Sequence, residues 1–320
     1  MKIWTAWVAV ALAMAVSLPS LASAEDGYPN RPIELWVGYS AGSGTDAHAR
    51  VLAPALSEAL GASVVVVNKG GAGGLSMWSE LAHAKPDGYT LGIINFPALA
   101  TGIATTKLSF DPFKDLTYFG NATADAVTLA VSAQSPYKSI DAVVEAAKKN
   151  PGKLSVGITG RTSQDFLTAR SIEKETGAKF KYVVFPGNNE GINALLGGHI
   201  DMMTMVTSTA ANFYSSGQMD MLAVGVDERM PDFPKVPTFK EKGINLFGGG
   251  ALNYKALGAP AGLPPEIQAK ISDALVKIVK DPNFAAKVKA MGSFAYYMDG
   301  PSFEKLGENQ AQLVRQFVQN

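Results

Sequence analysis

Residues 40–46 read Ser-Ala-Gly-Ser-Gly-Thr-Asp, between an apolar run at 33–39 and an amphipathic segment that begins at Ala47. This order predicts a buried strand, a loop of small residues and the start of a helix. The first amides of a helix have no partner inside the helix, and the helix dipole gives them partial positive charge. The loop therefore predicts a site for an anion, which we interpret as a carboxylate. The other interpretation is that its two glycines only form a tight turn between strand and helix.

The N-terminus has the pattern of an export signal. A lysine follows Met1, an apolar run spans 8–16, and Ala22-Ser23-Ala24 is typical of a cleavage site. Cleavage after Ala24 would leave 320 − 24 = 296 residues. The apolar run is shorter than the roughly 20 residues that cross a membrane. The chain has no cysteine, which excludes a cysteine-linked lipid anchor. These features predict a soluble protein of the bacterial periplasm.

The charges of the chain balance, with 28 basic and 28 acidic residues. Proteins that bind nucleic acid need a basic face, so this balance does not indicate a nucleic-acid partner. The three histidines, His48, His83 and His199, are scattered along the chain and are not accompanied by a set of metal-ligating residues. We expect all three to be structural, and we expect neither a metal nor a cofactor.

The rest of the chain alternates between strand-like and helix-like segments, which predicts parallel βα units. Strand-like runs at 63–67 and 89–95 continue the first series. A second series has runs at 154–158, 182–185, 200–206 and 221–226. The segment 106–119 reads as irregular. The tail has one strand-like run, at 252–257, and three helical segments, so we expect it to return to the first series.

We therefore expect an α/β protein of two lobes, joined by two crossings of the chain near Asp125 and near Gly249. The expected domains are a signal peptide at 1–24, a first lobe at 25–124 plus 250–320, and a second lobe at 125–249. Ligands of parallel sheets bind beyond the carboxyl ends of the strands. Two such edges that face each other would form a cleft that closes by a hinge motion.

Several short motifs, in a fixed order, resemble one protein family. They are Tyr-Pro-Asn-Arg-Pro-Ile at 28–33, Gly-Thr-Asp at 44–46, Gly-Ala-Gly-Gly at 71–74, Lys-Pro-Asp-Gly-Tyr-Thr-Leu at 85–91, Leu-Leu-Gly-Gly at 195–198, Val-Pro-Thr at 236–238 and Ala-Pro-Ala-Gly-Leu-Pro at 259–264. Together they cover nearly all of the chain after the signal. They resemble the periplasmic receptors of tripartite tricarboxylate transporters, the Bug-type binding proteins.

The resemblance implies a periplasmic binding protein fold of type II, in which two βα lobes close like a Venus flytrap, and it implies no catalysis. It also implies a small organic anion as ligand, such as a dicarboxylate, a tricarboxylate or an aromatic acid. The implied partner is a two-subunit membrane permease, and we expect the receptor itself to be a monomer. In such receptors two facing loops hold the carboxylate, partly through water. The corresponding site residues are Tyr39, Ser40, Ala41, Ser43, Gly44, Thr45, Asn95, Thr159, Gly160, Arg161, Thr162, Ser163, Phe185, Gly187 and Asn188.

The sequence departs from the family pattern at the expected site. In the first loop, Gly38-Tyr39 stand where the family has Pro-Phe, and Ser43 stands where it has glycine. Val67 replaces a glutamate. In the second loop, Arg161-Thr162-Ser163 replace a glycine-rich pattern, and Asp165 stands near an expected histidine. Because these changes fall at the expected cleft, the ligand of a relative cannot be transferred to this chain.

Single residues near the loops allow two interpretations each. Arg161 is expected either to hold a carboxylate in a bidentate pair or to be an exposed arginine that pairs with Asp165. Phe96 and Phe185 are expected either to stack on an aromatic ligand or to pack in the core. Asp46 is expected to complement the N-terminus of its own helix.

Two other functions fit parts of the first loop. Residues 38–42 read Gly-Tyr-Ser-Ala-Gly, the G-x-S-x-G pattern that would make Ser40 the nucleophile of an exported serine esterase. However, this pattern follows the first strand, no oxyanion motif precedes it, and no histidine lies in the last third of the chain. Residues 42–47 fit G-x-G-x-x-A of dinucleotide binding, but the acidic residue expected about 20 residues later is absent.

Overall fold

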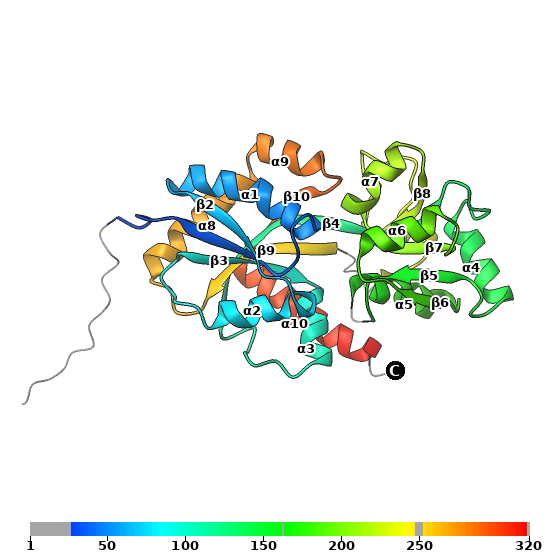
Figure 1. Cartoon of the computed structure of the whole chain (residues 1–320), viewed down its shortest axis with the longest axis horizontal. Coiled ribbons are helices and arrows are strands. Elements are labelled where there is room, and N and C mark those ends of the chain that lie inside the picture. Colours follow the sequence, from blue (N-terminus) through cyan, green and yellow to red (C-terminus); the bar gives the residue numbers. More distant parts are fainter. Residues whose placement is uncertain (1–26, 162, 247–251, 319–320) are drawn as a thin grey trace, which may run out of the picture.

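The structure is a computed structural model that describes residues 27–161, 163–246 and 252–318. The expected signal peptide, Thr162 and the expected crossing near Gly249 therefore lie outside the described residues. Figure 1 shows two α/β lobes side by side, with strands that run from one lobe into the other. The two-lobed fold expected from the sequence is confirmed. Among the described residues, no helix is long and apolar enough to cross a membrane.

The first lobe, on the left of Figure 1, has a mixed sheet in the order β2-β1-β3-β9-β4-β10. Its first three strands are parallel, and β9, β4 and β10 run antiparallel to their neighbours. The strands are β1 (Ile33–Val37), β2 (Val64–Asn68), β3 (Thr90–Phe96), β4 (Leu116–Ser132), β9 (Leu252–Pro260) and β10 (Phe294–Asp299). These strands carry β-branched and aromatic residues that suit a pleated, buried surface.

Helices cover both faces of this sheet (Figure 1). One face is covered by α1 (Gly44–Leu60), α8 (Pro265–Val279) and α9 (Pro282–Lys289), which share one apolar cluster with β1 and β3. The other face is covered by α2 (Leu75–Ala82), α3 (Ala98–Thr105) and α10 (Gly300–Val318). A short 3₁₀ turn, η1 (Ala72–Gly74), precedes α2. The central strands β3 and β9 are almost fully buried, which explains why they read as apolar runs without alternation.

The second lobe has a smaller sheet in the order β6-β5-β7-β4-β8, in which β5, β6 and β7 are parallel. Its strands are β5 (Ser155–Ile158), β6 (Lys181–Val184), β7 (Met202–Val206) and β8 (Met219–Val224). Its helices are α4 (Ile140–Lys149), α5 (Gln164–Thr176), α6 (Asn188–Leu196) and α7 (Thr207–Ser215), with a 3₁₀ turn at η2 (Lys240–Lys242). Each parallel strand is followed by a helix, so the helix starts gather at one edge of the sheet.

Strand β4 belongs to both lobes. Its residues up to Ala126 pair with β9, and from Val127 onward it pairs with β7 and β8. The segment 106–119 was expected to be irregular, which is wrong for 116–119, because these residues begin β4. The first half of β4 was missed because it contains buried polar residues, among them Asn121 and Asp125. The lobe boundaries themselves stay predictions.

Three further elements were not expected from the sequence. Strand β10 makes the tail contribute two strands rather than one, and the short helices α3 and α7 follow directly on strands β3 and β7. Strand β10 pairs with β4, about 170 residues earlier in the chain, as in the pair of Phe294 with Ala124. A pairing over such a distance has no local signal in the sequence.

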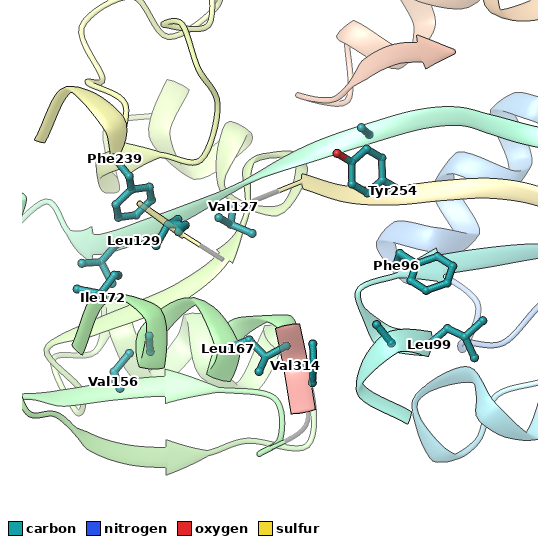
Figure 2. Close-up of a cluster of buried hydrophobic side chains, with 14 of the residues drawn as sticks. Phe96, Leu99, Val127, Leu129, Val156, Leu167, Ile172, Phe239, Tyr254 and Val314 are labelled. Atoms are coloured by element: carbon teal, nitrogen blue, oxygen red, sulfur yellow. The ribbon is translucent and has the colours of Figure 1, made fainter. Parts of the chain in front are cut away.

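The apolar core continues from one lobe into the other (Figure 2). Phe96 and Leu99 lie in the first lobe, and Val156 and Leu167 lie in the second. Figure 2 also shows Val314 of the C-terminal helix α10 beside Leu167 of α5. Helix α10 therefore packs on the first lobe and also contacts the second.

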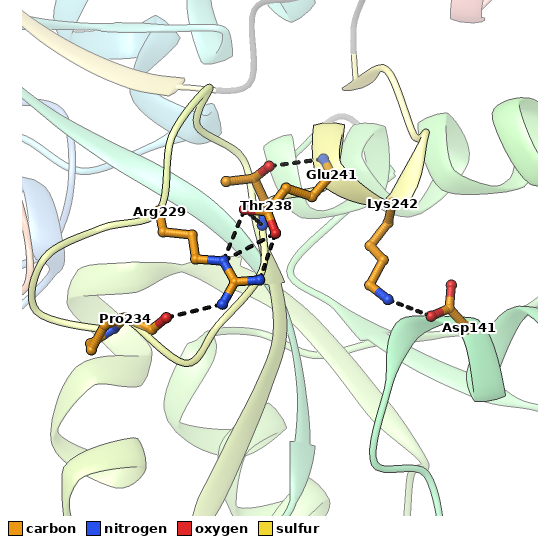
Figure 3. A network of polar contacts seen from close by, with 6 residues as sticks. All are labelled: Asp141, Arg229, Pro234, Thr238, Glu241 and Lys242. Carbon is orange, nitrogen blue, oxygen red and sulfur yellow. Dashed lines mark hydrogen bonds and ion pairs between the residues drawn. The ribbon is translucent and has the colours of Figure 1, made fainter.

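The segment after β8 is held by a polar network on the second lobe (Figure 3). Arg229 donates to Glu241, with Nη2 2.6 Å from Oε2, and to the carbonyl oxygen of Pro234 at 3.1 Å. Asp232 of this segment forms an ion pair, at 3.1 Å, with Lys289 of α9 in the other lobe. Exposed ion pairs contribute at most about 1 kcal/mol each, so this network orders the segment rather than stabilising the fold strongly.

Candidate functional site

The helices that follow the two expected loops start in the same way. Ser43 precedes α1 in an extended conformation, and its Oγ accepts the N–H of Asp46 at 3.2 Å. Ser163 precedes α5 in an extended conformation, and its Oγ accepts the N–H of Phe166 at 3.2 Å. Each serine is therefore an N-cap that takes the third amide of its helix. The earlier amides of both helices are left for another acceptor.

Those earlier amides are the strongest sign of a ligand site. Within the part of the chain that the structure describes, the N–H groups of Gly44, Thr45 and Gln164 have no hydrogen-bond acceptor. Each lies in the first turn of a helix, where the dipole favours a negative group. These three N–H groups, two in the first lobe and one in the second, are the donors that an anion could accept from.

In the first loop, the carboxylate of Asp46 takes one of the donors. It accepts the N–H of Gly42 at 2.8 Å, Nδ2 of Asn68 at 2.9 Å and Nε of Arg50 at 2.9 Å. Burial raises the pKa of Asp46, but the bonds from Arg50, Gly42 and Asn68 outweigh it and hold the pKa below its usual value. Asp46 is therefore an ionised group that complements its own helix start, as expected from its position.

In the second loop, Asp165 takes the donors of Thr159. Its Oδ2 accepts the hydroxyl of Thr159 at 2.5 Å and the N–H of Thr159 at 3.3 Å. Thr159 was expected to contact the ligand, but both of its donors are engaged within the loop. Arg161 is exposed and does not pair with Asp165 among the described contacts, so the pairing suggested from the sequence is wrong. Burial is the main reason that the pKa of Asp165 is raised, to about 6.

Tyr39 of the first lobe lies within the electrostatic range of Asp165 in the second lobe. Tyr39 lies at the end of β1, in the first lobe, and its hydroxyl donates to the carbonyl oxygen of Gly73 at 2.9 Å. Burial raises the pKa of the Tyr39 phenol, and the Asp165 carboxylate of the second lobe raises it further. An electrostatic effect of this kind requires the two groups to be close. Tyr39 of the first lobe and Asp165 of the second therefore lie near each other at the junction of the lobes.

Side-chain amides on the strands connect the two helix starts. Nδ2 of Asn95, on β3, donates to Oγ1 of Thr45 at 3.1 Å. Nδ2 of Asn253, on β9, donates to Oε1 of Gln164 at 2.6 Å. The hydroxyl of Thr45 accepts this bond, so among the described contacts its O–H and its N–H both stay available as donors. Gln164 and Asn253 were missed by the sequence analysis, although Gln164 directly follows the N-cap Ser163, which is a usable signal.

A buried ionic cluster lies beside these amides. Asp125 of β4 pairs with Lys255 of β9, and the hydroxyl of Ser293 donates to the same carboxylate. Burial raises the pKa of Asp125, but the charge of Lys255 and the hydrogen bond from His48 outweigh it and hold the pKa far below its usual value. Burial, and then Lys255, lower the pKa of His48, so its ring is neutral. The cluster has no net charge.

The residue types Ser293, His48 and Asp125 are those of a catalytic triad, but their geometry is not. Nε2 of His48 lies 3.1 Å from Oγ of Ser293 and 3.5 Å from Oδ2 of Asp125, while its Nδ1 is buried without a partner. A triad needs the serine and the aspartate on different ring nitrogens. Ser293 is also only 2% exposed. For Ser40, the described contacts include no histidine.

The remaining expected residues differ in their surroundings. Phe185 is half-buried and packs with the apolar cluster of the second lobe, next to Gly191. Gly187 is the N-cap of α6 without a side-chain bond, and Oδ1 of Asn188 is buried without a partner. Phe96 is fully buried against Phe303, with ring centroids 5.2 Å apart, so it does not stack on a ligand. Ser40 and Ala41 are exposed, Gly160 is half-buried in the second loop, and Thr162 lies outside the described residues.

The raised pKa of Asp165 leads to a test by pH. The folded protein binds more protons than the unfolded chain between the usual carboxyl pKa near 4 and the folded value of about 6, so stability falls as pH rises through this window. Asp165→Asn does not titrate. The stability of this variant relative to the parent should therefore increase by about 1–3 kcal/mol from pH 4 to pH 7. Thermal melts across this range measure the difference, and a difference that is flat with pH would contradict the burial of a charge at Asp165.

Comparisons with known proteins agree with this architecture. The model of the tripartite tricarboxylate transporter family receptor matches residues 48–320. The chain is 35% identical over 303 residues to a UPF0065 protein in the gbd 5' region of Cupriavidus necator, with 95% of this chain and 91% of that protein covered. The solved structure of the periplasmic binding protein BugD is similar at 27% identity and a TM-score of 0.78, with 91% of this chain and 98% of that chain covered.

A further solved structure, MatC from Rhodopseudomonas palustris with bound malate, shares the fold at 24% identity and a TM-score of 0.79, with 91% of this chain and all (100%) of that chain covered. The resemblance inferred from the short motifs is therefore confirmed by comparisons that extend over most of the chain. The chain belongs to the receptor family of the tripartite tricarboxylate transporters, the family of the Bug-type binding proteins.

Proposed function

We propose that this protein is a periplasmic receptor that binds a small organic carboxylate between its lobes and presents it to a two-subunit membrane permease. The observation that carries the proposal is the pair of capped helix starts, which leave the N–H groups of Gly44, Thr45 and Gln164 without acceptors among the residues that the structure describes. Two helix dipoles that converge on one negative group stabilise it without any cation. Family membership and the malate bound to MatC support the choice of a carboxylate.

In the proposed mechanism, the lobes separate, the ligand enters, and contacts from both lobes then favour the closed state. A ligand shifts such an equilibrium only by its difference in affinity for the two states. Amides from both α1 and α5 can contact one ligand only when the lobes are close. The bond from Asn253 to Gln164 and the contact of Val314 with Leu167 also join the lobes, and they belong to this closed arrangement.

The periplasmic location and the monomeric state are part of the proposal. The export pattern at 1–24 supports the location. The lobe boundaries are proposed as before, with 25–124 plus 250–320 in the first lobe and 125–249 in the second. The change of partners along β4 near Ala126 supports that division. No catalytic role is proposed, because the family and the similar structures are those of binding proteins.

A thermal-shift screen tests the function. The purified mature protein is heated with a panel of mono-, di- and tricarboxylates and aromatic acids, each beside its uncharged primary amide. At least one acid should raise the melting temperature by several degrees, since a ligand at 100 times its Kd adds about 2.7 kcal/mol to the stability. The matched amide should give no shift. A protein that responds to none of the acids, or equally to acids and amides, would not be a carboxylate receptor.

A further inference from the structure

Three side-chain amides at the junction of the lobes each leave one buried polar atom unpaired within the described part of the chain. These atoms are Oδ1 of Asn95, Oδ1 of Asn253 and Nε2 of Gln164. Asn95 is 2% exposed and Gln164 is 7% exposed. Buried polar groups in native proteins are nearly always paired, and each unpaired one costs about 1–3 kcal/mol. Three such atoms in one place indicate partners that come from outside the chain.

The three amides lie between the helix starts. In the sheet, Asn95 of β3 stands directly opposite Lys255 of β9, and Asn253 is two residues before Lys255. Directly opposite residues, and residues two apart on one strand, share a face of the sheet. Asn95 is bonded to Thr45 of α1, and Asn253 to Gln164 of α5. The unpaired atoms therefore border the place where the proposed carboxylate is held.

The subsite offers both a donor and an acceptor, whichever way the amides are turned. If Asn253 and Gln164 are both reversed, the bond between them persists, and one N–H and one oxygen still stay free. Asn95 adds one further polar atom in either orientation. The nearby ionic cluster of Asp125, Lys255 and neutral His48 carries no net charge. A second carboxylate placed here would lose its hydration without meeting a net positive charge.

We propose that the ligand carries a hydroxyl group beside its single carboxylate, and that the amides of Asn95, Asn253 and Gln164 bind this hydroxyl. A hydroxyl both donates and accepts, which matches the free atoms of the subsite. The substrate class is thus the small hydroxy monocarboxylic acids, in preference to dicarboxylates or unsubstituted acids. This inference rests on the proposed function, because the subsite is defined by its position next to the carboxylate.

Calorimetric titration with four-carbon acids tests this class. The ligands are 2-, 3- and 4-hydroxybutyrate, with butyrate as the acid that lacks the hydroxyl and succinate as the acid with a second carboxylate. At least one hydroxybutyrate should bind ten times more tightly than both butyrate and succinate. An acid without a hydroxyl leaves the polar groups of the subsite unpaired when it binds. If succinate or butyrate binds as tightly as every hydroxybutyrate, the inference is overturned while the proposed function stands. If none of the acids binds, and the broad screen also finds none, the proposed function itself fails.

A variant links the preference to the amides. Gln164→Met keeps the length of the side chain and removes its polar atoms, so the ratio of butyrate Kd to hydroxybutyrate Kd should fall at least fivefold. Gln268→Met is the matched control, since Gln268 lies on α8 and donates to the carbonyl oxygen of Leu263. The ratio should be unchanged in the control. If the ratio in Gln164→Met equals that of the parent, Gln164 does not bind the hydroxyl of the ligand. If a variant folds poorly, the titrations of the unmodified protein still decide whether the ligand is a hydroxy monocarboxylic acid.

Discussion

Gly44→Pro is expected to weaken carboxylate binding about 10- to 100-fold and to leave the ligand-free protein as stable as the parent. Proline lacks the N–H that Gly44 offers to the ligand, and a hydrogen bond to a charged group contributes about 1.5–3 kcal/mol. Gly44 is the first residue of α1, the position at which helices accept proline. Ser43 before it has φ −70° and ψ 160°, which suits a residue that precedes proline.

Gly44→Ala is the matched control for this experiment. A Cβ at Gly44 would meet nothing within 4 Å, so the control adds a side chain and keeps the N–H. Calorimetry on both variants, with the ligand found in the screen, separates the loss of the N–H from the addition of a side chain. Gly44→Pro should bind at least ten times more weakly than Gly44→Ala, with melting temperatures within about 2 °C of each other. Equal affinities would show that this amide does not contact the ligand.

Asp125→Ala is expected to destabilise the protein by about 3–5 kcal/mol, because it leaves a buried ammonium group without its partner. The side chains of Asp125 and Lys255 are 1% and 4% exposed, so water cannot replace the lost carboxylate. Ser293 and His48 lose the same acceptor. For a chain of this size, the loss corresponds to a fall of roughly 10 °C in the melting temperature.

Two further variants control for this result. Asp125→Leu combined with Lys255→Met removes both charges and should be more stable than Asp125→Ala, since an apolar pair avoids the cost of a lone buried charge. Asp227→Ala removes one partner of the exposed pair with Lys240 and should change the stability by less than about 0.5 kcal/mol. If Asp125→Ala melts within 2 °C of the parent, the cluster does not hold a buried charge pair.

The first helix start was predictable because its signals are local. A strand of apolar residues, a loop of small residues and a serine before the helix are all adjacent in the sequence, and Ser43 and Ser163 are N-caps in the structure. The second loop was read from the strand at 154–158 and the helix after it, and the family resemblance implied that it faces the first loop. Thr159 was wrongly expected to keep its donors free for the ligand. The carboxylate of Asp165 accepts both its N–H and its hydroxyl.

The connections between the helix starts could not be predicted. Asn253 meets Gln164, 89 residues earlier, only because β9 pairs with β3 and β4 in one particular register. A change of register by one residue would turn Asn253 to the other face of the sheet. Lys255 and Asp125 are buried charges whose pairing also depends on that register. Such contacts arise from tertiary structure alone.

A crystal structure of the protein with the carboxylate found in the screen tests the central claim most directly. We expect the oxygens of the carboxylate to lie within hydrogen-bond distance, about 2.7–3.2 Å, of N–H groups from both helix starts, Gly44 or Thr45 in α1 and Gln164 in α5. A carboxylate that is bound by one lobe only, or held away from both helix starts, would contradict the account.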